Sequence, residues 1–169
     1  VMADTATKIP LASVTLSSAS SDVTFASISQ SYKDLFVVIH TGADAASDNL
    51  SVRLNGDGGT NYSTIELYKV NASAGAQKVT NTDKLRLQIA NACDGSTVRN
   101  TYIVNFNSYS NSSTYKTALC RNGGNTGSYP GLALLVGTWR NANPITSLTF
   151  FYNSGNLLSG STFNLYGIL

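Results

Sequence analysis

Residues 138–169, TWRNANPITSLTFFYNSGNLLSGSTFNLYGIL, form the stretch that decides the fold. This stretch holds two segments rich in β-branched and aromatic residues, 145–152 and 161–168, each bounded by Asn, Ser, Gly or Pro. Such segments between turn residues are typical of strands rather than helices. A loose tail of this composition would expose Phe163, Leu165 and Ile168 to water, so we expect the end of the chain to lie in the core of a sheet.

Strand patterns continue upstream of this stretch. Alternating or continuous apolar residues predict strands near Val14 and Val23 and over residues 35–40, 49–55, 62–70, 85–89, 98–109, 115–121 and 132–139. Turn residues separate them at the spacing of about 8 to 12 residues that is typical of β-sandwiches. We therefore expect an all-β protein, a single antiparallel β-sandwich of about ten strands over residues 11–169, with little or no helix.

For some segments the sequence also predicts burial or exposure. Residues 35–40 (LFVVIH) are apolar on both faces, so this strand is expected to be central in its sheet, and residues 132–139 (LALLVGTW) are expected to form a buried strand. Residues 71–82 (NASAGAQKVTNT) are small and polar, which favours an exposed loop. Residues 1–10 are weakly patterned and are expected to form an N-terminal arm.

Three pieces of the chain resemble segments of small tailed-phage virion proteins. The closing piece comprises Trp139, residues 145–148 (ITSL) and residues 160–168 (GSTFNLYGI), and the upstream pieces are residues 27–35 (SISQSYKDL) and 55–62 (NGDGGTNY). Proteins of this group are single β-sandwich modules of jelly-roll type, either capsid decoration (cement) proteins or tail appendage components. The resemblance therefore implies jelly-roll connectivity and a place in a bacteriophage virion.

The composition excludes several classes of function. Charged residues make up 12% of the chain and the formal net charge is +2, with Lys and Arg scattered singly, so no basic stripe is available for nucleic acid. No apolar run reaches the length of about 18 residues that a membrane span needs, and the N-terminus does not match a secretory signal. We expect a protein made in the host cytoplasm, with neither nucleic acid nor a membrane as a partner.

The residue types that catalysis uses are few. His40 is the only histidine and ends an apolar strand, where a structural or exposed role is expected rather than that of a general base. Two-His metal sites and His-assisted nucleophiles need more than one histidine can supply. Glu66 is the only glutamate, and most Asp residues occupy turn or strand-end positions, so a glycosidase pair of carboxylates is not indicated. We expect no enzyme activity and no catalytic residue.

Two other motifs have a structural explanation. Residues 55–61 (NGDGGTN) offer oxygen ligands, but a tight turn built on Asn-Gly and Asp-Gly explains them without calcium, because the further ligands of an EF-hand are absent. Cys93 and Cys120 are too few for a disulfide framework and lack the spacing of a zinc site. Two free thiols are expected, with a single bridge between them as the alternative. We expect no metal and no cofactor.

A binding or assembly function is what these exclusions leave. The resemblance implies a capsid cement protein, a homotrimer that binds the outer shell of the virion and stabilises contacts between major capsid protein subunits. The alternative is a tail or fibre module that binds a host surface glycan, because tyrosine rings at loop edges can stack on sugars. The tyrosines in such positions are Tyr62, Tyr109, Tyr115 and Tyr129.

Overall fold

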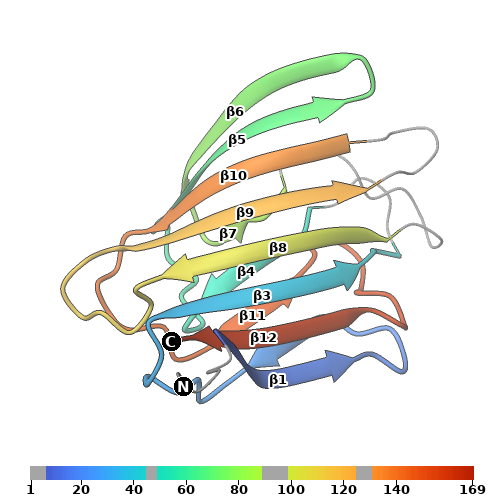
Figure 1. The fold of residues 1–169 in the computed structure, drawn as a ribbon. Coiled ribbons are helices and arrows are strands. Elements are labelled where there is room, and N and C mark those ends of the chain that lie inside the picture. The colour runs from blue at the N-terminus through green and yellow to red at the C-terminus, as the bar shows by residue number, and fades with distance from the viewer. Residues whose placement is uncertain (1–6, 45–48, 89–98, 125–130) are drawn as a thin grey trace, which may run out of the picture.

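Two antiparallel sheets make up the protein. The computed structural model describes residues 7–44, 49–88, 99–124 and 131–169, and in these ranges the chain forms twelve β-strands and no helix (Figure 1). The expectation of an all-β sandwich is confirmed. All neighbouring strands in both sheets pair antiparallel.

The larger sheet has eight strands and the smaller has four. In spatial order, the eight-stranded sheet consists of β1 (Lys8–Thr15), β12 (Thr162–Ile168), β3 (Asp34–Thr41), β8 (Asn100–Asn107), β9 (Lys116–Gly124), β10 (Gly131–Trp139), β5 (Tyr62–Val70) and β6 (Ser73–Thr82). The four-stranded sheet consists of β2 (Asp22–Phe25), β11 (Leu148–Phe151), β4 (Ser51–Leu54) and β7 (Leu85–Arg86). This pairing does not confirm the jelly-roll connectivity that the resemblance implies, which stays a prediction.

The core lies between the two sheets. Phe150 of β11 packs against Phe163 of β12 with ring centroids 5.7 Å apart, and both side chains are fully buried. Phe25 of β2 meets the Phe150 ring edge-on at 6.3 Å. At β10 and β7 the two sheets approach closely, because a Cβ on Gly137 would lie 2.2 Å from Cδ1 of Leu85. The terminal strand is therefore part of the core, as its apolar composition predicts.

One loop prediction is wrong. Residues 73–82 form β6, a ten-residue strand paired with β5, although the segment 71–82 lacks the apolar alternation of a strand. β6 is the last strand of the sheet order, and none of its residues is buried. An edge strand of this kind is held by its backbone pairing, so its side chains need not be apolar. At the other edge β1 begins at Lys8, so residues 8–10 of the expected arm pair with β12, and residues 1–6 lie outside the described residues.

The expectation that residues 132–139 form a buried strand holds for one face of β10 only. Ala133, Leu135 and Trp139 point into the core. The alternate side chains face outward, where Leu132, Leu134 and Val136 are 62%, 45% and 50% exposed. The smaller sheet covers one face of the larger sheet, and the apolar residues of β10 occupy both faces.

Candidate interaction surface

An exposed apolar surface lies on the outer face of the eight-stranded sheet. Register places Leu119 of β9, Val136 of β10 and Ile65 of β5 side by side across three neighbouring strands. In the next outward row Leu134 stands beside Leu67, and Leu132 follows along β10. We call these side chains the apolar stripe: Ile65, Leu67, Leu119, Leu132, Leu134 and Val136. Each of them is between 42% and 62% exposed.

The apolar stripe is large enough to require an explanation. Covering six side chains that are about half exposed would contribute on the order of 5 kcal/mol, because complete burial of one such side chain contributes about 1.5 to 3 kcal/mol. Single apolar side chains on a surface are ordinary, whereas contiguous exposed groups of them mark places where another molecule binds. The stripe is contiguous because β9, β10 and β5 are adjacent strands and their register places the apolar residues beside one another. It is therefore the best candidate for a binding surface in the described part of the chain.

An arginine, Arg121, lies beside the apolar stripe on β9. Arg121 of β9 stands between Ile103 of β8 and Leu134 of β10 in the pairing register. Together with Leu119 and Asn105, these side chains line a shallow hollow of about 120 Å³. The Arg121 side chain makes no hydrogen bond or ion pair with any residue that the structure describes. An arginine surrounded by apolar side chains is the typical composition of the energetic centre of a protein interface.

The charge of this surface is of one sign. Lys69 of β5, Lys78 of β6 and Arg121 face outward around the stripe. The single carboxylate on strands β5, β6, β8, β9 and β10 is that of Glu66, which points inward and is buried. A complementary partner would therefore present an apolar area that also carries carboxylates.

Asp57, in contrast, has its carboxylate fully engaged by the protein. In the turn after β4 it accepts hydrogen bonds from Trp139 Nε1 at 2.6 Å, from the Gly59 N–H at 2.8 Å and from Asn61 Nδ2 at 2.9 Å. Partial burial raises the pKa of Asp57, but the hydrogen bonds from Trp139, Asn61 and Gly59 outweigh this and hold the pKa below its ordinary value. The loop is a structural turn that Asp57 ties to the core.

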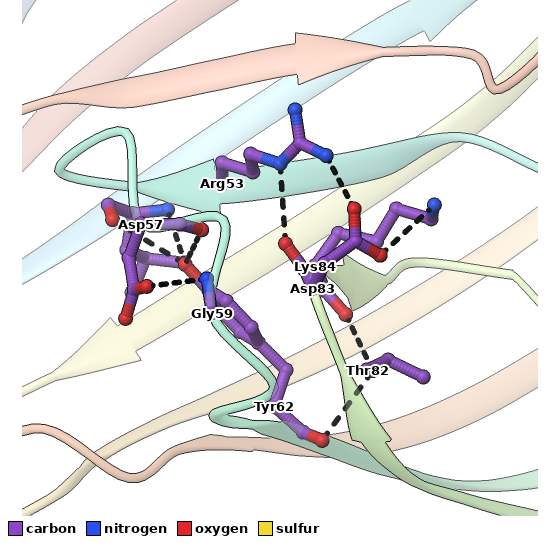
Figure 2. Close-up of polar contacts among 8 residues, drawn as sticks. Arg53, Asp57, Gly59, Tyr62, Thr82, Asp83 and Lys84 are labelled. Atoms are coloured by element: carbon purple, nitrogen blue, oxygen red, sulfur yellow. Dashed lines mark hydrogen bonds and ion pairs between the residues drawn. The ribbon is translucent and has the colours of Figure 1, made fainter.

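Figure 2 shows this turn beside a second polar cluster, formed by Arg53, Asp83 and Lys84. Arg53 donates through Nε to the Asp83 carbonyl at 3.1 Å and through its terminal nitrogen to the Asp83 carboxylate. Lys84 Nζ lies 3.2 Å from the other carboxylate oxygen. Partial burial raises the pKa of Asp83, but hydrogen bonds from Arg53 and Lys84 bring it below its ordinary value. The cluster joins β4 to the start of β7.

The residues considered for catalysis are not brought together. His40 is exposed on β3, and its hydrogen-bond partner is the Thr101 hydroxyl at 3.3 Å. Glu66 is buried on the opposite face of the sheet, because residue 66 of β5 points into the sandwich. In the ranges that the structure describes, no three His, Cys, Asp or Glu side chains form a group that could hold a metal ion. No described helix is long and apolar enough to cross a membrane.

Cys120 is a buried free thiol. Its Sγ lies 3.6 Å from the Leu87 carbonyl oxygen, and burial raises the pKa of the thiol well above its ordinary value. A thiol kept protonated in this way is a poor nucleophile. Cys93 lies outside the described residues.

The tyrosines differ from the expectation for sugar stacking. Tyr62 and Tyr109 are fully buried, and Tyr115 is 60% exposed. Tyr62 stacks on Trp139 with ring centroids 6.3 Å apart, and its hydroxyl donates to the Asp57 carbonyl at 3.0 Å. Tyr129 lies outside the described residues. Sequence reasoning took Tyr62 for a surface residue because its neighbours are turn residues, whereas it is the first residue of β5 and points inward.

Comparison with known proteins adds no relative. No protein-family model matches the chain, and no curated protein and no solved structure matches it. Sequence reasoning missed the apolar stripe, although its signal was present in the sequence. In β10 both alternating sets of residues are apolar, and only the position of the second sheet decides which set is covered.

Proposed function

We propose that this protein is a structural protein of a tailed-phage virion, a capsid cement protein that binds the outer shell and holds major capsid protein subunits together. The observation that carries the proposal is the exposed apolar stripe with Arg121 beside it, a composition that suits contact with another protein. The resemblance of residues 160–168 to virion proteins supports the same context, and these residues include the core strand β12. The trimer that the resemblance implies belongs to this proposal and would form on the shell.

The chemistry of the surface defines the contact that the shell must offer. A major capsid protein lattice would present apolar side chains to the stripe and a carboxylate to Arg121. Binding to the assembled lattice alone stabilises the lattice by mass action, since each occupied site adds RT ln(1 + [L]/Kd). The stripe is aliphatic, with no aromatic platform for a sugar ring, so the geometry favours a protein partner over a glycan.

The test compares particles with and without this protein for the temperature at which they rupture. We expect the protein to raise that temperature, and we expect Arg121→Glu and Leu134→Lys each to weaken binding to the shells about tenfold or more, because both changes fall at the centre of the contact. Lys33→Glu is the matched control for Arg121→Glu, since Lys33 is exposed outside the strands and the charge change is the same.

All three variants must first be shown to melt cooperatively like the wild type. Equal rupture temperatures with and without the protein would contradict cementing. Shell binding that is unchanged by Arg121→Glu and Leu134→Lys would contradict the use of the apolar stripe. Saturable binding to a host glycan, with no effect on the shells, would instead support the tail module.

A further inference from the structure

A second feature, independent of the stripe, is the open edge of β6. β6 pairs with β5 on one side and ends the order of the sheet, as Figure 1 shows at the upper end of the molecule. No described strand lies along its other side. Its ten residues contain no proline and one charged side chain, Lys78. The backbone N–H and C=O groups on that side are therefore available to another strand.

The other sheet edges are blocked or short. β1 carries Pro10 and an irregularity of register between Pro10 and Ala12. β2 has four residues and β7 has two. On β6 the irregularity falls at Asn81, which has a φ of +57° and stands at the end of the strand. Proteins usually protect long edges with prolines, bulges and charges, and over residues 73–80 β6 has neither a proline nor a bulge and carries a single charge, that of Lys78.

We propose that β6 pairs antiparallel with β6 of a second copy of this chain, about a two-fold axis at Gln77. In this register Ala76 stands opposite Lys78 of the second copy, Gly75 opposite Val79, and Ala74 opposite Thr80. The side chains of β6 are small in the first half of the strand and larger in the second half. Antiparallel self-pairing therefore places each small side chain opposite a larger one. The strand is thus complementary to itself.

The inner face of the strand selects this register. The Tyr68 ring lies over Gly75, because a Cβ on Gly75 would be 2.7 Å from the Tyr68 hydroxyl oxygen. On this inner face Tyr68 of β5 stands beside Gly75 of β6. In the proposed register Val79 of the second copy would stand on the other side of Gly75 and continue this cross-strand row. A register centred on Lys78 would set two ammonium groups directly opposite each other. A register centred on Ala76 would set Val79 opposite Ser73 at the strand end, away from the aromatic ring.

The paired strands join two eight-stranded sheets into one continuous sheet. A two-fold axis perpendicular to the sheet keeps the outer faces of both copies on the same side. The two apolar stripes then face the same direction, one on each side of the β6 pair. The pairing does not depend on what the stripes bind.

The experiment measures association of the full chain by sedimentation equilibrium over the concentration range in which it stays soluble. We expect a monomer–dimer equilibrium for the wild type. Ala76→Lys sets like charges opposite each other at two symmetric positions and should weaken the dimer about tenfold. Ala76→Glu sets opposite charges there and should strengthen it. The double variant Ala76→Lys, Lys78→Glu restores two attractive pairs and should recover the dimer.

Ser13→Lys is the matched control, because it adds the same charge at the exposed β1 edge and should leave association unchanged. Each variant is checked for an unchanged melting temperature, since residues 76 and 78 are exposed and point outward. A wild type that stays monomeric would overturn the proposal. So would a dimer or trimer that is indifferent to Ala76→Lys, or one that Ala76→Glu weakens.

Discussion

Asp57 is the residue through which the turn after β4 is fastened to the rest of the protein. Its carboxylate accepts from the Trp139 indole and from two donors of its own loop. Trp139 in turn stacks on Tyr62, whose hydroxyl accepts from the Leu54 N–H at 3.1 Å. A single charged group thus orients the largest side chain of the core.

We predict that Asp57→Ala lowers the free energy of unfolding by about 1 to 3 kcal/mol at neutral pH, because three donors lose a charged acceptor. Asp57→Asn should cost less, since its amide oxygen still accepts. The folded-state pKa of Asp57 lies below the unfolded value. Its contribution is therefore complete above about pH 4 and is lost as the pH falls through the folded pKa.

Urea unfolding of wild type and Asp57→Ala at neutral and strongly acidic pH measures this effect. The difference in stability between the two proteins should shrink on acidification. A difference that stays constant with pH would mean that the carboxylate charge contributes nothing, and that only the shape of the loop matters.

Among the strands, β12 is the one on which both the larger sheet and the core depend most. It lies between β1 and β3, and it contributes Phe163 and Leu165, which are fully or almost fully buried. Tyr166 and Ile168 alternate with these residues and are half-buried on the outer face. Its loss would separate β1 from the sheet as well as open the core.

We predict that a chain lacking residues 161–169 does not fold cooperatively. Burial of Phe163 and Leu165 alone contributes about 3 to 6 kcal/mol, which is a large part of the stability of a typical domain. Circular dichroism during heating measures the outcome. A truncated chain that melts cooperatively near the wild-type temperature would contradict this role of β12.

How far the sequence predicts an element depends on what covers it. β12 is predicted well because its inward residues face the second sheet and carry the apolar alternation of a strand, and β3 because its continuous apolar run is typical of a strand in the middle of a sheet. β6 could not be recognised, because its pairing is a backbone property that leaves no trace in SAGAQKVTNT. The candidate site was missed for a related reason: the run LALLV in β10 has the same composition whether a second layer lies on its outer face or not.

At the scale of the whole molecule, stability should need neither a metal ion nor a disulfide. We predict that a chelator and a thiol reductant each change the melting temperature by less than about 2 °C. Loss of a native disulfide usually costs about 2 to 5 kcal/mol, which would lower the melting temperature several degrees further in a chain of this size. Calorimetry with and without each reagent measures the shift. A drop of many degrees with reductant would indicate that Cys93 forms a bridge.

The position of β12 between β1 and β3 also has a consequence for the order in which the protein forms. On the ribosome β1 is the first of the described strands to be made and β12 is the last, so roughly 7 to 30 seconds of synthesis separate the two. Throughout that time β1 lacks β12, its neighbour in the order of the described strands, and the edge of β3 that pairs with β12 stays open. The growing chain can assemble β8, β9, β10, β5 and β6 beside β3, but it cannot place its own first strand. The nascent protein therefore depends on β12 to give β1 a place in the fold.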